Sequence, residues 1–383
     1  MATAVQVQYR RGTAAQVASF TGAAGEMVVD TSNDRVVVQD GSTAGGFAAA
    51  KLSEVGGGHL NKFRNGTFDV WQRGAAPSLS AGTSGAQYTA DGWAVGWTAS
   101  ASAAPAIAQA GGRLLTKSSL EITGATNLTD VYVWQRIESL IAAAFCSQTV
   151  TVQAQVYNNT GGAITPKLTV NRPSVQDDYA SVTADVNAVP LQSCANGAWT
   201  QVAYTFSANA ASYNGLEIVF DFGNNFSSSS KSIQIAECDI RVTAGIPAGQ
   251  QTPANFIPPV ELRHVASETV FCQRYYWQWT PGNNAPVNIL SAFSGTQAWG
   301  ALFDLPVTMR AAPTCAVSSA AHFSMSAGGG GKTVTATDFT NSTPSTVATW
   351  NGWTASSASF AAGQAIILVT QSASAWISAS AEL

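Results

Sequence analysis

The stretch QTVTVQAQVYN, residues 148–158, alternates apolar and polar side chains along its length. Its apolar members are Val150, Val152, Ala154 and Val156, which fall on one side of an extended chain because successive side chains of a strand point to opposite faces. A period of two over such a length predicts a half-buried antiparallel strand. The fold of the surrounding region follows from how often this pattern recurs.

Two further stretches repeat the pattern. GLEIVFDFG, residues 215–223, places its large apolar side chains at every second position, and SIQIAECDIRV, residues 232–242, does so with one phase shift between Ile235 and Ile240. The turn signals NNTGG, CANGAW and GNNFSSSS separate such segments. We therefore predict an all-β protein in which residues 60–250 form a jelly-roll-like sandwich of about eight strands. Within it QRIESLIAAAF, residues 135–145, has helical spacing and predicts a helix.

Charged residues are unusually rare in this chain. They make up 10% of the 383 residues, against about 25% in typical soluble domains. The 11 Trp, 16 Phe and 9 Tyr residues exclude disorder, because disordered chains lack such side chains. A membrane-spanning helix is not expected either, because no run of about 18 apolar residues occurs. We expect a compact protein whose surface is solvated by Ser, Thr, Asn and Gln.

The net charge and the positions of His and Cys, the usual metal-binding residues, argue against several classes of function. The net charge of −4 and the isoelectric point of about 5.4 argue against binding of nucleic acid. His59, His264 and His322 lie far apart, and the five Cys occur singly, so we expect free thiols and neither a metal site, a cofactor nor a disulfide framework. Residues 1–16 lack the apolar segment of a secretion signal, which predicts synthesis in a cytoplasm.

Composition divides the chain into three units. The first, residues 1–55, contains two short strands, residues 27–29 and 35–38, around the turn DTSND. Strands this few are marginal on their own, so we expect the unit to need a partner. Three consecutive glycines, residues 56–58, predict a hinge before the sandwich.

The third unit, residues 255–383, is predicted to be a second β-sandwich. It begins with a Pro-rich linker and a short helix, residues 265–273, and from residue 276 onward it carries only five charges but six of the eleven Trp. A segment of this composition is either deeply buried or packed against copies of itself. We expect it to form the outward tip of the molecule.

Several motifs carry a resemblance to known proteins. Residues 8–46 contain in order Arg-Gly-Thr, Phe-Thr-Gly, Gly-Glu, a strand, an Asp turn, a strand, Asp-Gly and Gly-Gly. This order resembles the small repeat at the N-termini of bacteriophage tail fibres and tropism determinants. NGTFDVWQRG, YTADGWAVGW, VWQRIE, IAECDIRVTAG and VELRHVASETVFCQRYYW resemble a carbohydrate-binding-like module of phage tail fibre proteins, and LPVTMRAAPTC also recurs in that group. Gly92 departs from the pattern, because that family usually carries Arg between the Asp and the Trp.

The resemblance, which covers roughly residues 8–310, implies a receptor-binding fibre of a virion. Its N-terminus would attach to other virion proteins of the tail, baseplate or capsid, and its host ligand would be a cell-surface polysaccharide. The implied particle-anchoring residues are Arg11, Gly25, Glu26, Asp40 and Gly41. A homotrimer is implied as well, without nucleic acid and without membrane insertion. A structural head fibre or adaptor that binds no ligand is the milder alternative.

The segment NGTFDVWQRGAAPS, residues 65–78, combines aromatic and charged residues just after the glycine-rich break. We expect its aromatic and aliphatic side chains to be core anchors at the start of the sandwich. Asp69 and Arg73 are expected to tie the segment to the next loops, YTADGW among them, through charge-assisted hydrogen bonds. Simple solvation and ligand binding remain the alternatives for these two residues.

An enzyme, a polysaccharide depolymerase, is the main alternative to a binding protein. A glycosidase needs two carboxylates about 5 to 10 Å apart. The candidates are Asp177 with Asp178, Glu237 with Asp239, and Asp221. Adjacent residues of a strand point to opposite faces, and the Glu237 strand should face the core or a neighbour. We therefore predict no catalytic residue and no enzymatic activity.

Aromatic residues of the third unit are candidates for glycan binding. Sugar rings present apolar C–H faces that stack on Trp, while polar neighbours bond the hydroxyl groups. The predicted glycan-binding residues are Trp350, Asn351, Trp353 and Trp299. The Asn-Gly dipeptide between two of these tryptophans is a hairpin signal that favours their exposure. The alternative is that they lie in the core or at a subunit interface.

Overall fold

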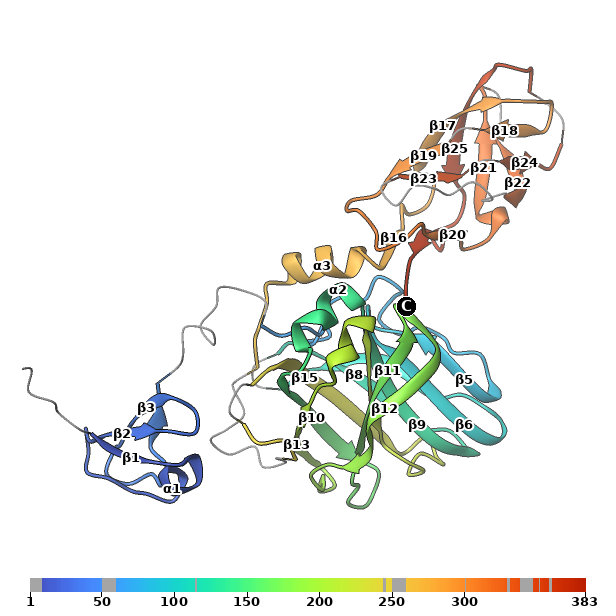
Figure 1. Cartoon of the computed structure of the whole chain (residues 1–383). Coiled ribbons are helices and arrows are strands. Elements are labelled where there is room, and N and C mark those ends of the chain that lie inside the picture. Colours follow the sequence, from blue (N-terminus) through green and yellow to red (C-terminus); the bar gives the residue numbers. More distant parts are fainter. Residues whose placement is uncertain are drawn as a thin grey trace, which may run out of the picture.

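The structure is a computed structural model that describes residues 9–49, 60–113, 116–243, 246–249, 260–299, 301–328, 331–337, 347–350, 352–357 and 360–383. Strands dominate it, as Figure 1 shows, which confirms the predicted all-β class. The glycine hinge predicted at residues 56–58 lies outside the described residues.

The N-terminal unit is a four-stranded sheet with one short helix. Its strand order is β1-β2-β3-β4. The elements are β1 (Arg10–Gly12), α1 (Ala14–Ala18), β2 (Met27–Asp30), β3 (Arg35–Val38) and β4 (Phe47–Ala48). Strands β2 and β3 pair antiparallel and confirm the two strands predicted around DTSND. Among its described residues the buried hydrophobic cluster consists of Val17, Val28 and Val37, with Phe20 packed against them, so this core is small.

Two sheets form the central sandwich. The five-stranded sheet has the order β13 (Ala198–Ser207), β10 (Thr149–Asn159), β15 (Ser232–Val242), β8 (Ser118–Thr123) and β7 (Ala106–Gly111). The six-stranded sheet has the order β12 (Asp178–Pro190), β11 (Lys167–Val175), β14 (Leu216–Asp221), β9 (Leu128–Ile137), β6 (Ala94–Ala103) and β5 (Gly82–Tyr88). The strands predicted at residues 148–158, 215–223 and 232–242 are thus β10, β14 and β15.

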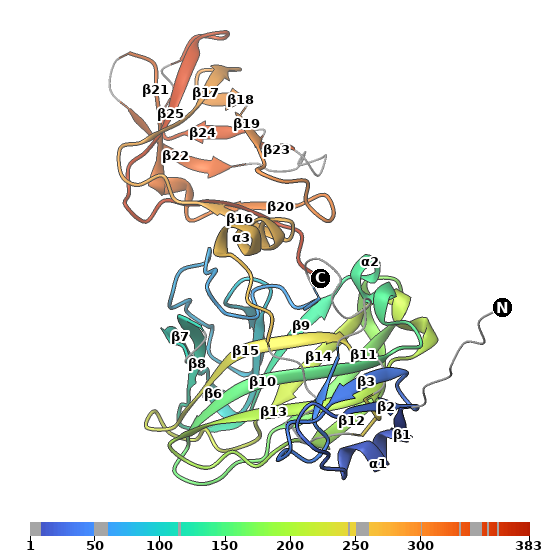
Figure 2. The ribbon, with the colours of Figure 1, turned by 90° about the vertical axis from the view of Figure 1, so that its left-hand side faces the viewer.

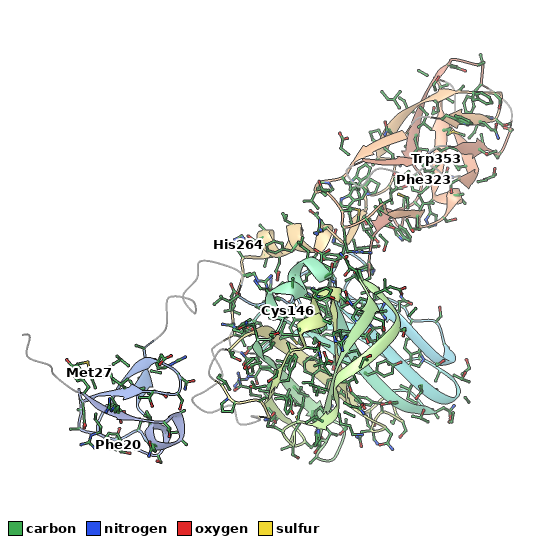
Figure 3. The ribbon with its side chains drawn as sticks, in the orientation of Figure 1. Phe20, Met27, Cys146, His264, Phe323 and Trp353 are labelled. Carbon is green, nitrogen blue, oxygen red and sulfur yellow. The ribbon has the colours of Figure 1, made fainter. Side chains whose placement is uncertain are left out.

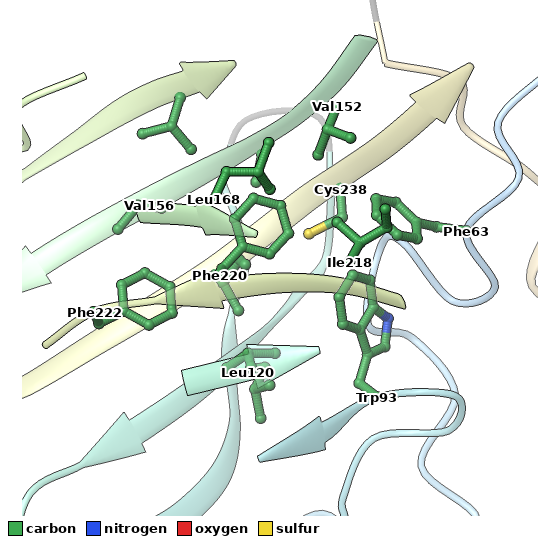
Figure 4. Packing of buried hydrophobic residues seen from close by; sticks show 14 of the residues in the cluster. Phe63, Trp93, Leu120, Val152, Val156, Leu168, Ile218, Phe220, Phe222 and Cys238 are labelled. Carbon is green, nitrogen blue, oxygen red and sulfur yellow. The ribbon is translucent and has the colours of Figure 1, made fainter. Parts of the chain in front are cut away.

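The apolar side of each strand faces the space between these sheets. Val152 and Val156 of β10 lie in the same buried cluster as Ile218 and Phe220 of β14, as Figure 4 shows. The predicted phase shift in β15 is an irregularity in its pairing with β10, where Glu237 has a positive φ of 51°. The extra residue lets both halves of β15 turn their isoleucines inward.

The prediction of a helix over residues 135–145 is wrong for the first residues of that range. Residues up to Ile137 belong to β9, and only α2 (Ser139–Ala142) and the 3-10 turn η1 (Ala143–Phe145) are helical. Leu140, predicted on the buried stripe, is 76% exposed. Pairing with β14 extends β9 through Ile137, so long-range hydrogen bonding overrides the local helical spacing. A second 3-10 turn, η2 (Ala210–Asn214), lies beside α2.

The third unit closes its main sheet into a barrel, where the sequence predicted a second sandwich. The barrel order is β17 (Pro286–Ala292), β18 (Gln297–Trp299), β24 (Trp353–Ala355), β22 (Lys332–Thr337), β21 (Phe323–Ser326) and β25 (Ala365–Thr370). Smaller sheets consist of β16 (Tyr276–Trp279), β26 (Ile377–Ser380) and β20 (Thr314–Val317), and of β19 (Ala301–Asp304) with β23 (Val347–Trp350). A 3-10 turn, η3 (Ala320–His322), precedes β21. Closure removes the open edges that a sandwich of such short strands would leave.

Helix α3 (Val265–Gln273) stands between sandwich and tip in both views of Figures 1 and 2, and confirms the helix predicted there. It begins at His264, whose Nδ1 accepts a hydrogen bond from the Ala266 amide at 3.2 Å. Its buried Glu268 accepts a hydrogen bond from the Asn65 amide at 3.0 Å and pairs with Arg263 at 2.6 Å. The helix is therefore bonded to the first segment of the sandwich.

Arg73 joins the sandwich to the tip. Its guanidinium lies 3.2 Å from Glu382 and 4.0 Å from Asp91, and it covers the Tyr276 ring at 3.4 Å from the centroid. Gln72 adds hydrogen bonds to Asp91 and to the Tyr276 carbonyl. The expected tie between Arg73 and YTADGW is present as the ion pair with Asp91, whereas the side-chain hydrogen bond of Arg73 goes to Glu382.

The remaining predictions for this segment divide in two. Phe68 is fully buried and tilts against Trp93 at 5.1 Å between ring centroids, as a core anchor should. Val70 is buried too, and Trp71 packs against the same core. Asp69 instead lines an open pocket of about 390 Å³ beside Lys117 and Val265.

Candidate functional site

The four residues predicted to bind glycan, three tryptophans and one asparagine of the third unit, do not share one environment. Trp299 is 52% exposed and stacks on Phe293, which is 61% exposed, at 4.9 Å between centroids and 18° between ring planes. The exposure expected of Trp353 is contradicted, because its side chain is fully buried and packs edge-on against Phe323 at 5.3 Å (Figure 3). Barrel closure turns this residue inward. Trp350 belongs to β23, and Asn351 lies outside the described residues.

The residues predicted to anchor the particle lie in or beside turns of the first unit. Gly25 and Gly41 have φ angles of 82° and 86°, which favour glycine. Glu26 pairs with Arg10 at 2.9 Å, and Asp40 accepts hydrogen bonds from the Ser42 and Thr43 amides, which hold its pKa well below the usual range. Arg11, on β1, is exposed. Their role in anchoring stays a prediction.

The carboxylates considered for catalysis are engaged in structural contacts. Asp177 accepts hydrogen bonds from the amide and hydroxyl of Ser139 at the start of α2. Asp239 pairs with Arg241 in the buried part of β15, and Glu237, 1% exposed, lies 3.7 Å from Arg113. Neither Glu237 nor Asp239 faces solvent, where a polysaccharide would have to meet it.

A more distinctive arrangement occupies the outer face of the six-stranded sheet. Strand β9 turns Val131 and Val133 into the core, so that Tyr132 and Trp134 lie on its other face, half-buried. Their rings stack at 5.6 Å between centroids, with 27° between the ring planes. We call these two rings the aromatic platform.

Small residues on the neighbouring strand make the platform possible. Gly96 of β6 lies directly opposite Tyr132, and Ala94 lies opposite Trp134. A Cβ at position 96 would come within 2.4 Å of the Tyr132 ring and 2.8 Å of the Trp134 ring, so both rings lean over this glycine. Because opposite residues of paired strands share a face, the rings extend across the sheet towards β6. Any side chain at Gly96 would lift them.

Polar side chains flank the platform on its other side. Asp221 of β14 lies opposite Tyr132, and Asp130 precedes Tyr132 by two residues on β9, so both carboxyl groups share its face. The two carboxyl groups lie close enough for the charge of one to affect the protonation of the other. Burial, and then the Asp221 charge, raise the pKa of Asp130, while burial and the Asp130 charge raise the pKa of Tyr132.

The next row of the same face is internally paired. Arg136 donates to Glu217 at 2.7 Å and to the Leu383 carbonyl at 2.8 Å, and Asn171 donates to the other Glu217 oxygen at 2.9 Å. The side chains of Arg136, Glu217 and Asn171 therefore bond one another, and Arg136 also bonds the C-terminal residue of the tip. The Trp134 indole nitrogen, by contrast, has no hydrogen-bond partner within the described part of the chain.

This geometry suits a flat ligand with an apolar face and a hydroxylated edge. Stacked aromatic rings offer the apolar surface, and the Asp130–Asp221 pair offers hydrogen-bonding oxygens beside it. Neither Tyr132 nor Trp134 is among the predicted glycan-binding residues, all of which lie in the third unit. The sequence contains a signal for this site. In LTDVYVWQRI, residues 128–137, the side chains that alternate with the buried valines are Asp, Tyr, Trp and Arg, and two large aromatic rings are unusual on a strand face exposed to water.

Fold and site thus define an all-β protein with an aromatic platform on the outer face of a sandwich. Among known proteins, residues 7–43 match the family model described as the major tropism determinant N-terminal domain. The chain is also similar to the tail fiber receptor-binding protein of Bordetella phage BPP-1, with 45% identity over 83 residues, or 22% of this chain and 21% of that protein. The match thus spans about a fifth of each protein.

Solved structures show a general likeness of shape. The CBM22-1 xylan-binding domain of Paenibacillus barcinonensis Xyn10C covers 44% of this chain and 99% of its own, at 17% identity and a TM-score of 0.29. The enzymatically active domain of bacteriophage CBA120 tailspike protein 4 covers 48% of this chain and 22% of its own, at 11% identity and a TM-score of 0.32.

Three observations concern metal ligands, cysteines and membranes. Among the residues that the structure describes, no three His, Cys, Asp or Glu side chains gather where they could hold a metal ion. The five cysteines are free thiols. None of the described helices is long and apolar enough to cross a bilayer.

Proposed function

We propose that this protein is a virion fibre that attaches to the phage particle through its N-terminal unit and binds a host surface glycan. The match of residues 7–43 to the tropism-determinant domain supports the first part. The aromatic platform carries the second part, because stacked half-buried rings beside hydrogen-bonding oxygens are what a sugar ring needs. We further propose three domains: residues 1–55 for anchoring, residues 60–250 for the sandwich and residues 255–383 for the tip.

Recognition would proceed by stacking and hydrogen bonding without bond cleavage. A pyranose lying on Tyr132 and Trp134 would cover the rings with its C–H face and turn its hydroxyl groups towards Asp130 and Asp221. Trp299, exposed on the tip, remains our proposal for a second contact with the same surface. Because two contacts on one chain strengthen each other through the high effective concentration of the second, weak single contacts would suffice.

The platform is tested by Trp134→Ala, measured as the affinity for purified host surface polysaccharide. We expect at least a 10-fold loss, which corresponds to about 1.4 kcal/mol and is within reach of one stacking ring. Trp199→Ala is the matched control, because Trp199 packs beside Tyr157 at 5.6 Å on a strand of the other sheet. Equal affinities for the Trp134 variant and the wild type would refute the proposed site, and Trp299→Ala tests the tip in the same way.

We also propose a homotrimer held partly by the N-terminal sheet. Met27 lies opposite Val38, and Val38 opposite Phe47, so three exposed apolar side chains share one face. With so small a core beneath, the sheet gains most of its stability by covering this face. Light scattering should report a trimer for the wild type and smaller species for Val38→Asp, while Leu140→Asp, at an exposed apolar site elsewhere, should leave the trimer intact. A monomeric wild type would refute the assembly.

The competing function, a depolymerase, has a direct test. Incubation with host polysaccharide should produce no new reducing ends, because the proposal assigns the chain no catalytic residue. A rise in reducing ends that is lost in Glu237→Gln or Asp239→Asn would establish an enzyme. A structural head fibre or adaptor, the third reading, requires that no surface polysaccharide binds at all.

A further inference from the structure

We infer that the Asp130–Asp221 pair makes the aromatic platform selective for uncharged or amine-bearing saccharides and that it repels acidic ones. This inference rests on the proposed glycan binding and adds the ligand class. It depends on which charges stand next to the rings and which stand farther away, and the strand register determines both.

The charged groups nearest the Tyr132 ring are acidic. Asp221 lies directly opposite Tyr132 on the adjacent strand, and Asp130 lies two residues away on the same strand face. Adjacent strands are about 4.8 Å apart. A sugar centred on Tyr132 therefore lies about one strand spacing from Asp221 and about 7 Å, two residues along the strand, from Asp130.

The cations of this face are farther away or already engaged. Lys167 lies opposite Asp221 on β11, which puts it two strands from Tyr132 and next to the carboxylate it partly balances. Arg136 is bound to Glu217 and to the Leu383 carbonyl, and its guanidinium lies 4.5 Å from the centroid of the Tyr179 ring. Neither cation is placed to receive a carboxylate or phosphate of a ligand stacked on the platform.

On the opposite side of the rings there is no charge to compensate. Ala94 and Gly96 stand opposite Trp134 and Tyr132 on β6, and Ala86 stands opposite Gly96 on β5. Strand β6 carries no charged residue. The ligand would thus lie between a neutral shelf and an acidic rim.

The size of the effect follows from the separation. Two like charges about 5 Å apart at a protein surface repel enough to change affinity by between about 4-fold and 200-fold, depending on how much water lies between them. A protonated amine gains by the same factor. Neutral sugars are unaffected by charge and keep the carboxyl oxygens as hydrogen-bond partners for their hydroxyl groups.

The test uses an array of bacterial surface polysaccharides in which each acidic glycan is paired with its methyl ester, the same backbone without the charge. For the full-length wild type we expect every pair that depends on Trp134 to favour the ester by about 10-fold or more. Asp130→Asn/Asp221→Asn should reduce that preference to about 3-fold or less. The control Asp178→Asn/Asp185→Asn changes the net charge equally on β12, away from the rings, and should leave the preference unchanged.

Several results would overturn the inference. Acidic glycans that bind as tightly as their esters would do so, as would a preference that survives in the Asp130→Asn/Asp221→Asn variant. Should that variant not fold, raising the ionic strength with the wild type must shrink the preference, because salt screens exposed charges; a salt-independent preference refutes the role of charge. If no glycan binds in a Trp134-dependent way, the proposed function itself fails, which distinguishes the two failures.

Discussion

Replacing Arg73 by alanine should destabilise the junction between sandwich and tip. The guanidinium is 14% exposed and contacts Glu382 at 3.2 Å and Asp91 at 4.0 Å, whose carboxylates are 7% and 1% exposed. Removing it leaves two carboxylates in a largely dry site. Breaking a buried ion pair in this way costs about 3 to 5 kcal/mol, and the contact with the Tyr276 ring, at 3.4 Å, is lost as well.

Part of this charge is balanced by other groups. Gln72 donates two hydrogen bonds to Asp91, and Arg64 lies 3.9 Å from Glu382 while covering the Tyr275 ring. We therefore expect the lower end of the range, about 3 kcal/mol, which lowers the melting temperature of a domain of this size by about 6 to 12 °C. The loss should be smaller at pH 5, because Asp91 then takes up a proton and no longer needs a cation.

Scanning calorimetry at pH 7 and pH 5 measures the stability, and limited proteolysis reports whether the tip is released. Arg73→Lys keeps the charge but loses the planar stacking and the forked geometry, so it should fall between wild type and alanine. Arg10→Ala is the control: its pair with Glu26 is exposed and contributes at most about 1 kcal/mol. A melting temperature for Arg73→Ala within about 2 °C of the wild type would refute the reasoning.

Three further predictions follow from burial and close packing. Gly96→Ala should lift the platform rings, changing tryptophan fluorescence and weakening polysaccharide binding about 10-fold, because the new Cβ would stand 2.4 Å from the Tyr132 ring; unchanged fluorescence and affinity would contradict this. Burial raises the pKa of Asp91 to about 6, so its contribution to the free energy of unfolding is complete below about pH 4 and is lost as the pH rises through 6. Asp91→Asn should therefore flatten the dependence of the free energy of unfolding on pH by about 3 kcal/mol over that range. Parallel pH profiles of stability for the variant and the wild type would argue against this. Burial also raises the pKa of the Cys238 thiol, so a thiol reagent at pH 8 should label the partly exposed Cys146 first, and the reverse order in mass spectra would be incompatible with the structure.

The local sequence pattern predicted correctly those features that depend only on residues close together in the chain. The alternation in residues 148–158 marked β10 and the side of it that is buried, and the phase shift in residues 232–242 marked the irregularity at Glu237. The same reasoning placed helix α3 at residues 265–273. Each of these features depends on the order of side chains along a few turns or pleats, which a sequence displays directly.

Long-range packing decided the features that the pattern got wrong or missed. Strand β9 continues through Ile137 because β14 pairs with it there, although the local spacing favoured a helix. Trp353 is buried because the third unit closes into a barrel, which no single strand reveals. Neither outcome is visible from the residues involved.

By itself, the sequence determined the all-β class, the faces of the main strands and the scarcity of charge from residue 276 onward. Only the tertiary structure brought Arg73 to Glu382, 309 positions along the chain, and aligned Asp221 and Gly96 on either side of Tyr132. The physical reason is that alternation specifies which side of a strand is apolar but not which strand lies beside it. A binding surface built across three strands depends on that second choice.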